Sequence, residues 1–192
     1  RLLSKCTDHL SLLASPATLE REYDFGPDAF DPILDGLRGS VPYIVLDLPH
    51  MWTAWSKRVL LSADDVLFVA APDLANLRNI KNMYDFTRSS RPNDKAPVYL
   101  LNMTGMPKRP EVRAADFAKA LGAEPSANIP FEPQLFGTAA NNGQMIAEVN
   151  ASHKTSDIFL NLAKSITGRA VAKTAKKDFL SPLLARLRGK NA

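Results

Sequence analysis

The chain has 192 residues, of which 45% are apolar and 23% are charged, a composition typical of a folded globular protein. That length allows one domain with a substantial core, and no apolar run approaches the ~20 residues that a membrane-spanning helix needs. A single cysteine, Cys6, excludes an internal disulfide and indicates a reducing, cytoplasmic compartment.

The net charge of +4 is concentrated at the C-terminal end. Residues 171–192 carry six basic residues and one acidic residue, whereas the other 170 residues carry 18 basic and 19 acidic groups. The overall charge therefore gives no support for nucleic-acid binding. In the tail, Ser181 and Pro182 can begin a short helix with Leu183, Leu184 and Leu187 on one face. Such a basic amphipathic segment can lie on an anionic membrane surface, dock on protein, or be disordered.

The first third of the chain contains two predicted strands and two predicted helices. Residues 10–14 form a short apolar run that predicts a strand. Apolar residues at helical spacing follow Pro27, and Gly39 ends that helix. Residues 43–47 predict the second strand, and the mixed apolar and basic residues 52–62 are compatible with a second helix.

The second of these strands is the stretch on which the functional interpretation depends. It runs from Val41 to His50 as V-P-Y-I-V-L-D-L-P-H, and its unbroken apolar run is typical of a strand buried on both faces. Pro49 interrupts the run, which places Asp47 at the carboxyl end of a central strand, where open α/β sheets hold their ligands. An acid in this position suits a Walker B strand, whose aspartate helps to hold Mg²⁺, but Asp is also common as a plain turn residue.

The rest of the chain continues the alternation of strands and helices. Apolar runs at 66–71, 97–102 and 127–130 predict three more strands. Asp73 is a predicted N-cap for a long helix, and further helical patterns occupy 117–121, 133–149 and 156–166, the second of them broken by a turn at Asn141–Gly143. This alternation predicts an α/β fold, in which a parallel sheet with right-handed crossovers carries helices on both faces.

Several motifs that would define an activity are not found in the sequence. There is no G-x-x-x-x-G-K-[ST] phosphate loop, no G-x-G-x-x-G and no G-x-S-x-G elbow. His9, His50 and His153 are widely separated and have no cysteine pair beside them, so each is interpreted as a surface or capping residue.

Four segments together resemble the MinD/ParA class of deviant Walker ATPases, whose fold is P-loop NTPase-like, of the SIMIBI type. The branch that they resemble most is the CpaE/TadZ group of Flp (Tad) type IVb pilus assembly proteins. The segments are V-P-Y-I-V-L-D-L-P-H, S-A-D-D-V-L-F-V-A-A-P-D-L-A-N-L-R-N, V-Y-L-L-N and I-P-F-E-P-Q-L-F-G-T-A-A-N-N-G-Q-M-I. The resemblance covers residues 2–169 and implies one ATPase-type domain over 1–169, followed by a tail at 170–192.

The resemblance implies roles for individual residues. Asp47 matches the Walker B acid, which binds Mg²⁺ through water and takes part in ATP hydrolysis. Asn102 matches an asparagine that touches the adenine base, although an asparagine at a strand end also serves as a turn residue. Pro130, Phe131 and Glu132 match the segment that packs around the base.

The resemblance also implies a cellular role. It implies an ATP-driven homodimer that positions pilus secretion machinery, through contacts with its proteins, at the inner face of the cytoplasmic membrane or at a cell pole.

Two departures from this family's pattern lead to further expectations. The glycine-rich Walker A loop would lie before Arg1, so the chain is interpreted as an N-terminally truncated form that binds ATP weakly or not at all and lacks hydrolysis by itself. Residues 49–52 also replace a glycine that senses the nucleotide in relatives, which puts fast hydrolysis in doubt.

Two other interpretations remain open from the residues alone. One is a receiver-like phosphoacceptor domain with Asp47 as the phosphorylated residue, which needs an acidic pair at the end of the first strand. The other is a small-molecule enzyme on a Rossmann-like sheet, which the absence of G-x-G-x-x-G disfavours.

Overall fold

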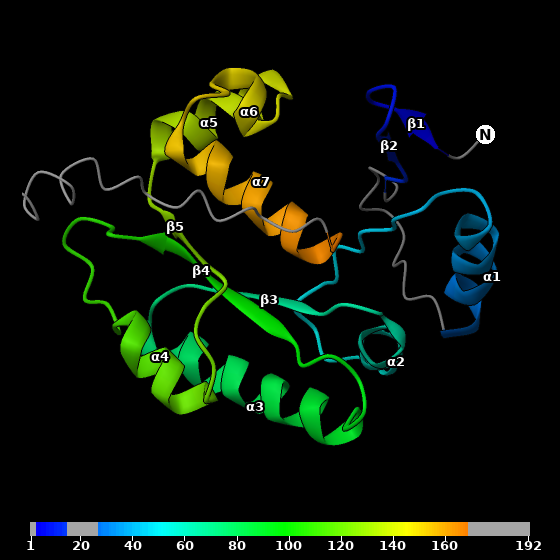
Figure 1. Ribbon diagram of the computed structural model, residues 1–192, viewed down its shortest axis with the longest axis horizontal. Helices are drawn as coiled ribbons and strands as arrows, with labels where there is room; N and C mark the ends of the chain where they lie inside the picture. The colour runs from blue at the N-terminus through cyan, green and yellow to red at the C-terminus, as the bar shows by residue number, and fades with distance from the viewer. Residues whose placement is uncertain (1–2, 15–26, 169–192) are drawn as a thin grey trace, which may run out of the picture. The chain divides into compact units, whose positions relative to one another are not determined.

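The structure, a computed structural model, describes residues 3–14 and 27–168 (Figure 1). The chain divides into two compact units, residues 1–62 and 63–192, and each is described by itself. The predicted tail helix, which begins at Ser181, lies outside the described residues.

A three-stranded parallel sheet is the centre of the second unit. It consists of β3 (Leu67–Ala70), β4 (Val98–Thr104) and β5 (Ala127–Pro130), in that spatial order. β4 lies in the middle, with Leu67 paired to Val98 on one side and Leu100 paired to Ala127 on the other. Because all three strands run the same way, their carboxyl ends meet at one edge of the sheet.

Helices cover both faces of this sheet (Figure 1). The crossover helices α3 (Leu74–Ser90) and α4 (Ala114–Leu121) pack together on one face. On the other face α7 (Lys154–Ile166) crosses over β5, after α5 (Pro133–Asn142) and the single turn α6 (Ile146–Val149). This arrangement confirms the predicted α/β class with a parallel sheet between helices.

The core forms where β4 is covered on both faces. Tyr99, Leu100 and Leu101 are each 2% exposed or less, although neighbouring residues of a strand point to opposite faces. The ring of Tyr99 stacks on that of Phe117 from α4 at a centroid distance of 6.4 Å, and its hydroxyl donates to the carbonyl of Ala123 at 2.9 Å. Burial raises the pKa of Tyr99 to about 12, which keeps the hydroxyl protonated as a donor.

The first unit contains two helices and a short hairpin. α1 (Pro27–Arg38) and α2 (Ala54–Ser62) contact each other, and the ring of Phe30 lies 4.1 Å from that of Trp55 between centroids. The predicted strand at 10–14 is only partly realised, because β2 (Ser11–Leu12) has two residues and pairs antiparallel with β1 (Ser4–Lys5). Leu10, Leu12 and Leu13 of the predicted run are exposed, so no burial of apolar side chains favours a longer strand.

The strand predicted at 43–47 is wrong. Residues 41–50 form no helix or strand, and Val45 is 94% exposed. A strand exists only where a neighbouring strand takes its backbone hydrogen bonds, and the described residues provide no partner for this run. An apolar run shows a preference for burial, but it does not create the sheet in which the run would be buried.

Most of the other predicted elements are confirmed. The helices at 27–38 and 52–62 correspond to α1 and α2, and the three later strands correspond to β3, β4 and β5. Gly122 ends α4 and Gly143 ends α5, each with a left-handed backbone that glycine adopts without strain. In the described part of the chain, no helix has both the length and the apolar character that crossing a membrane requires.

The two-sided burial of β4 predicts where truncation will destabilise the fold. Phe117→Ala removes a fully buried ring against Tyr99 and is expected to lower the unfolding free energy by about 3 to 5 kcal/mol. Leu160→Ala on α7, where the leucine is 52% exposed, serves as the control and should change it by no more than about 0.5 kcal/mol. Urea unfolding followed by circular dichroism measures both, and equal effects would contradict the assigned core.

Candidate functional site

Several polar side chains of the second unit lie at the carboxyl edge of the β3–β4–β5 sheet, where they form hydrogen bonds with nearby loops and helix starts. Asp73 follows β3, Asn102 lies near the end of β4, and Phe131 and Glu132 follow β5. This is the edge at which parallel α/β sheets hold ligands. All four residues predicted to contact a nucleotide base, Asn102, Pro130, Phe131 and Glu132, therefore lie at neighbouring strand ends.

The end of β4 is distorted by a bulge. Leu101 pairs with Asn128 and Thr104 pairs with Pro130. The chain therefore advances three residues along β4 where it advances two along β5, so β4 contains one extra residue. The extra residue is accommodated at Met103, whose φ of 57° lies in the left-handed region that non-glycine residues rarely adopt. The side-chain oxygen of Asn102 accepts the N–H of Met103 at 2.9 Å, so the amide nitrogen of Asn102 remains as the donor that a ligand can meet.

The end of β5 is tied to β4 and to α7. The N–H of Phe131 donates to the carbonyl of Thr104 at 2.8 Å, and the Thr104 hydroxyl donates to Ile129 at 3.1 Å. Glu132 accepts the hydroxyl of the fully buried Thr155 at 2.8 Å, and its carboxylate lies 3.6 Å from Nδ1 of His153. The segment predicted to contact a base is thereby held against the start of α7.

His153 begins α7 as a capping residue. Its Nδ1 accepts the N–H of Thr155 at 3.2 Å, which satisfies one of the donors left unpaired at a helix start. The interpretation of this histidine as a capping residue is confirmed.

At the end of β3, Asp73 is the N-cap of α3, as predicted. Its carboxylate accepts the backbone N–H of Asn76 at 2.8 Å and also the side-chain amide of Asn76. These hydrogen bonds, the backbone one first, lower the pKa of Asp73, and the positive charge of Arg109 adds to the effect against the opposing influence of burial.

The loop between β4 and α4 contains a second carboxylate that binds backbone N–H groups. Glu111 accepts the N–H of Gly105 and that of Met106, each at 3.1 Å, and the first of these lowers the pKa of Glu111 most. Arg109 donates to the carbonyl of Met103 at 2.6 Å and to Glu111 at 3.3 Å. The N–H of Val112 donates to Pro72 at 2.9 Å and so ties this loop to the end of β3.

Asp47 is the predicted site residue that belongs to the first unit. It is exposed and lies in the irregular stretch 41–50. No group of three or more His, Cys, Asp or Glu side chains within residues 3–14 and 27–168 is arranged to hold a metal ion.

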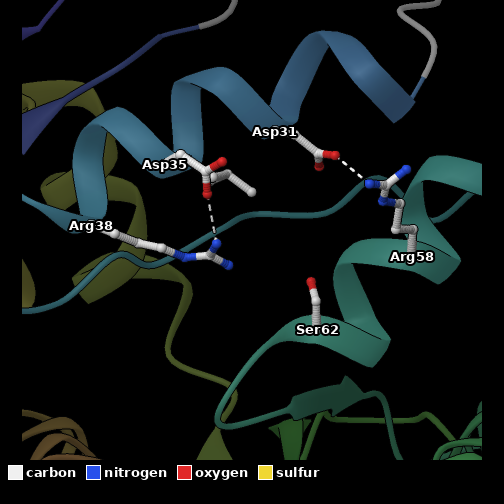
Figure 2. Close-up of a pocket in the computed structure, with 6 residues that line it drawn as sticks. Asp31, Asp35, Arg38, Arg58 and Ser62 are labelled. Carbon is white, nitrogen blue, oxygen red and sulfur yellow. Dashed lines mark hydrogen bonds and ion pairs between the residues drawn. The ribbon is translucent and has the colours of Figure 1, made fainter.

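A shallow cavity of about 260 Å³ lies between α1 and α2 in the first unit (Figure 2). Arg58 pairs with Asp31 and lies 3.5 Å from Asp28, while Arg38 pairs with Asp35 at 2.8 Å. Each arginine that faces the cavity is engaged by a carboxylate, so the two positive charges are neutralised by their neighbours. The cavity is a network of surface ion pairs between two helices and has none of the features of a phosphate site.

The acidic pair Asp64 and Asp65 lies at the opposite edge of the sheet. Both residues precede β3, and Asp65 pairs with Lys95, which precedes β4. A receiver-like phosphoacceptor needs its acidic pair at the carboxyl edge beside the acceptor aspartate. The geometry of this pair therefore gives that interpretation no support.

A parallel sheet between helices, with polar groups at its carboxyl edge, is consistent with a P-loop NTPase-like α/β fold. No family model matches the sequence, and a search of curated proteins finds no significant match. Solved structures do match. A ParA family ATPase from Chlorobium tepidum superposes with a TM-score of 0.68 at 19% identity, over 83% of this chain and 66% of that one.

Two archaeal MinD proteins match in the same way. The cell division ATPase MinD of Pyrococcus furiosus has a TM-score of 0.63 at 18% identity, over 76% of this chain and 60% of that one. The septum site-determining protein MinD of Pyrococcus horikoshii, complexed with Mg-ADP, has a TM-score of 0.62 at 18% identity, over 73% and 56%. The chain thus has the MinD/ParA-like fold, and it spans between 56% and 66% of the length of these three structures.

Sequence reasoning missed Arg109, Glu111 and the contact of Glu132 with α7. The composition of residues 104–110, rich in glycine, proline and basic residues, predicts a loop. It does not show which backbone N–H groups of that loop the carboxylate of Glu111 accepts. A Glu placed shortly after a glycine turn is the only signal that the sequence offers, and it is weak.

The capping role of Asp73 predicts a stability effect that depends on pH. Asp73→Ala is expected to lower the unfolding free energy by about 1 kcal/mol at pH 7, whereas Asp73→Asn, which keeps an acceptor oxygen, should lose much less. The pKa of Asp73 is lower in the folded chain than its ordinary 3.8, so the carboxylate stabilises fully above pH 3.8. That contribution is lost as the pH falls through the folded value.

Urea unfolding of the parent, Asp73→Ala and Asp73→Asn between pH 2.5 and pH 7 measures this effect. The difference between the parent and Asp73→Ala should shrink below about pH 3.8. A difference that stays constant down to pH 2.5 would show that the carboxylate charge has no part in the cap.

Proposed function

We propose that this chain is the nucleotide-base-binding part of a MinD/ParA-type ATPase that acts as a localisation protein in Flp (Tad) pilus assembly. The observation that carries the proposal is the placement of Asn102 beside Phe131 and Glu132 at adjoining ends of β4 and β5, on a MinD/ParA-like fold. These are the residues to which the family motifs give base contacts.

The geometry of the strand ends suits a planar base. The hydrogen bond from the N–H of Phe131 to the carbonyl of Thr104 places the backbone of Phe131 next to the end of β4, the strand that carries Asn102. The Phe131 ring is half-buried and offers a flat apolar surface, while the free amide hydrogens of Asn102 can meet an acceptor nitrogen of a purine. Glu132 can contribute to the proposed site without touching the base, because its hydrogen bond with Thr155 of α7 holds residues 130–132 in place.

The phosphates and Mg²⁺ of ATP need other groups. Asp47 is the residue that we propose binds Mg²⁺ through water, and this role rests on its motif, because in the described structure it is exposed and outside the sheet. One of the matched structures is a MinD complexed with Mg-ADP, which supports a magnesium nucleotide as the ligand class. A triphosphate is held mainly by backbone N–H groups and a lysine of a glycine-rich loop, which the 192-residue sequence does not contain.

The pilus role is proposed from the motifs of the CpaE/TadZ branch. The protein would form an ATP-dependent homodimer and position pilus secretion proteins at the inner face of the cytoplasmic membrane. Residues 171–192, which lie outside the described residues, would supply contact with anionic lipid through their six basic side chains and their leucine-rich stretch.

The base site predicts how this polypeptide responds to nucleotides. In calorimetric titrations with Mg²⁺, ATP should bind no more tightly than adenosine monophosphate, because the base contacts are present and the phosphate loop is not. Asn102→Ala and Phe131→Ala should each weaken binding about tenfold, the loss of one hydrogen bond or one ring contact. Asn161→Ala, at an exposed position of α7, is the control. Micromolar ATP binding that survives both changes would contradict the proposed site.

The pilus role predicts a phenotype. Deleting the gene in the organism that encodes it should abolish Flp pili at the cell surface, and a fluorescent fusion of the intact protein should gather at the membrane or pole. Removing residues 171–192 should disperse the fusion into the cytoplasm. Normal pili in the deletion strain would overturn the assignment, and an unchanged location of the shortened fusion would overturn the role of the tail.

A further inference from the structure

We propose that Arg109 and Glu111 are positioning residues, which hold the end of β4 in its bulged form and thereby set the direction in which Asn102 presents its amide. This inference rests on the proposed function, because Asn102 is the residue proposed to contact the base. It assigns a role to two side chains of the β4–α4 loop that no motif in the sequence singles out.

The first step is that the bulge needs support from outside the strand. Met103 has a left-handed backbone, a conformation that destabilises a non-glycine residue by about 1 kcal/mol or more. A bulge also leaves one residue of the strand without its regular ladder partner. Surrounding contacts must therefore hold this conformation against the regular strand that β4 follows up to Leu101.

The second step is that the two side chains supply this support. The Arg109 guanidinium donates to the carbonyl of Met103, the residue with the left-handed backbone. The carboxylate of Glu111 accepts the first two N–H groups after β4, those of Gly105 and Met106, and also accepts from Arg109. The two side chains are 23% and 25% exposed.

The third step links this network to Asn102. The side-chain oxygen of Asn102 accepts the N–H of Met103, so the position of the Met103 peptide fixes which end of the Asn102 amide turns outward. If the Met103 backbone returned to an extended strand, that N–H would move and the amide would lose its fixed orientation. Asn102 would then present oxygen and nitrogen about equally, and its hydrogen bond to a purine acceptor would lose selectivity.

The burial of the Nε atom of Arg109 indicates that the other contacts of this side chain keep it in place. The Nε atom is buried and has no hydrogen-bond partner among the described residues. An unpaired buried donor destabilises a fold, so the contacts of the same guanidinium with Met103 and Glu111 must outweigh that loss. Arg109 also adds positive charge beside Asp73, which ties the arrangement at β4 to the cap at the end of β3.

The test is nuclear magnetic resonance of the full chain, with ¹⁵N-labelled asparagine and methionine. The five methionines give backbone signals that include Met103 and Met106, and the Asn102 side-chain amide is assigned by its loss in Asn102→Ala. In Arg109→Ala and Glu111→Ala we expect the Met103 signal and the Asn102 side-chain pair to shift together. Arg113→Ala, which removes an exposed arginine of the same loop, should leave both unchanged.

Conservative variants separate positioning from general support of the fold. Glu111→Gln keeps one acceptor oxygen and should restore most of the Asn102 signal, whereas Arg109→Lys, which lacks the planar fork, should not. Urea unfolding of each variant checks that the fold persists. An Asn102 side-chain pair that keeps its parental position in folded Arg109→Ala and Glu111→Ala would overturn the proposal.

Binding of adenosine monophosphate gives a second readout. If the parent chain binds it, Glu111→Ala should bind about tenfold more weakly, and Glu111→Gln should recover most of the loss. Unchanged affinity in Glu111→Ala would count against the positioning role. If the parent does not bind adenosine monophosphate, the proposed base site fails, and the resonance experiment alone decides whether the two side chains orient Asn102.

Discussion

The parallel pairing of β4 with β3 on one edge and β5 on the other is the constraint on which the rest of the second unit depends. It buries Tyr99, Leu100 and Leu101 almost completely, because a strand paired on both edges and covered on both faces has no route to water. The stacking of Tyr99 on Phe117 then sets the position of α4, and the burial of Ile80 and Tyr84 sets that of α3. With these helices in place, the ends of the strands have fixed neighbours.

The same pairing explains why the candidate site forms at the end of β4. Regular pairing up to Leu101 gives way to a bulge, and the loop that follows returns to the strand end through Arg109 and Glu111. The end of β5 closes on the bulge through the bond from Phe131 to Thr104. The distortion and the residues proposed to be functional thus coincide, as they often do where a strand must present a side chain in a direction that a regular strand would not allow.

The site differs from the cavity in the first unit in one physical respect. Between α1 and α2 the charged side chains pair with each other on exposed helix surfaces, and such pairs contribute little energy. At the sheet edge, Asp73 accepts a backbone N–H of a helix start, Glu111 accepts backbone N–H groups of a turn, and Glu132 accepts the hydroxyl of Thr155 in α7. Contacts of that kind fix backbone geometry, which a ligand site requires.

Local patterns in the sequence were enough to predict most of the helices and strands and to reveal the family resemblance. Apolar spacing, caps such as Asp73 and C-terminal glycines such as Gly122 act within one turn of chain, so they can be interpreted without knowledge of the fold. The placement of Asn102, Phe131 and Glu132 at adjoining strand ends also follows from the order of strands in a parallel sheet. The matched MinD and ParA structures confirm the fold that these patterns predicted.

The tertiary structure alone decided the state of residues 41–50 and the contacts of Arg109, Glu111 and Thr155. Whether an apolar run becomes a strand depends on a partner edge elsewhere, and Asp47 is exposed because none of the described residues supplies one. Thr155 donates to Glu132 across 23 residues of chain, and the bulge next to Asn102 arises where β4 pairs with β5. A linear sequence specifies which groups can form such bonds, but only folding decides which of them come within reach.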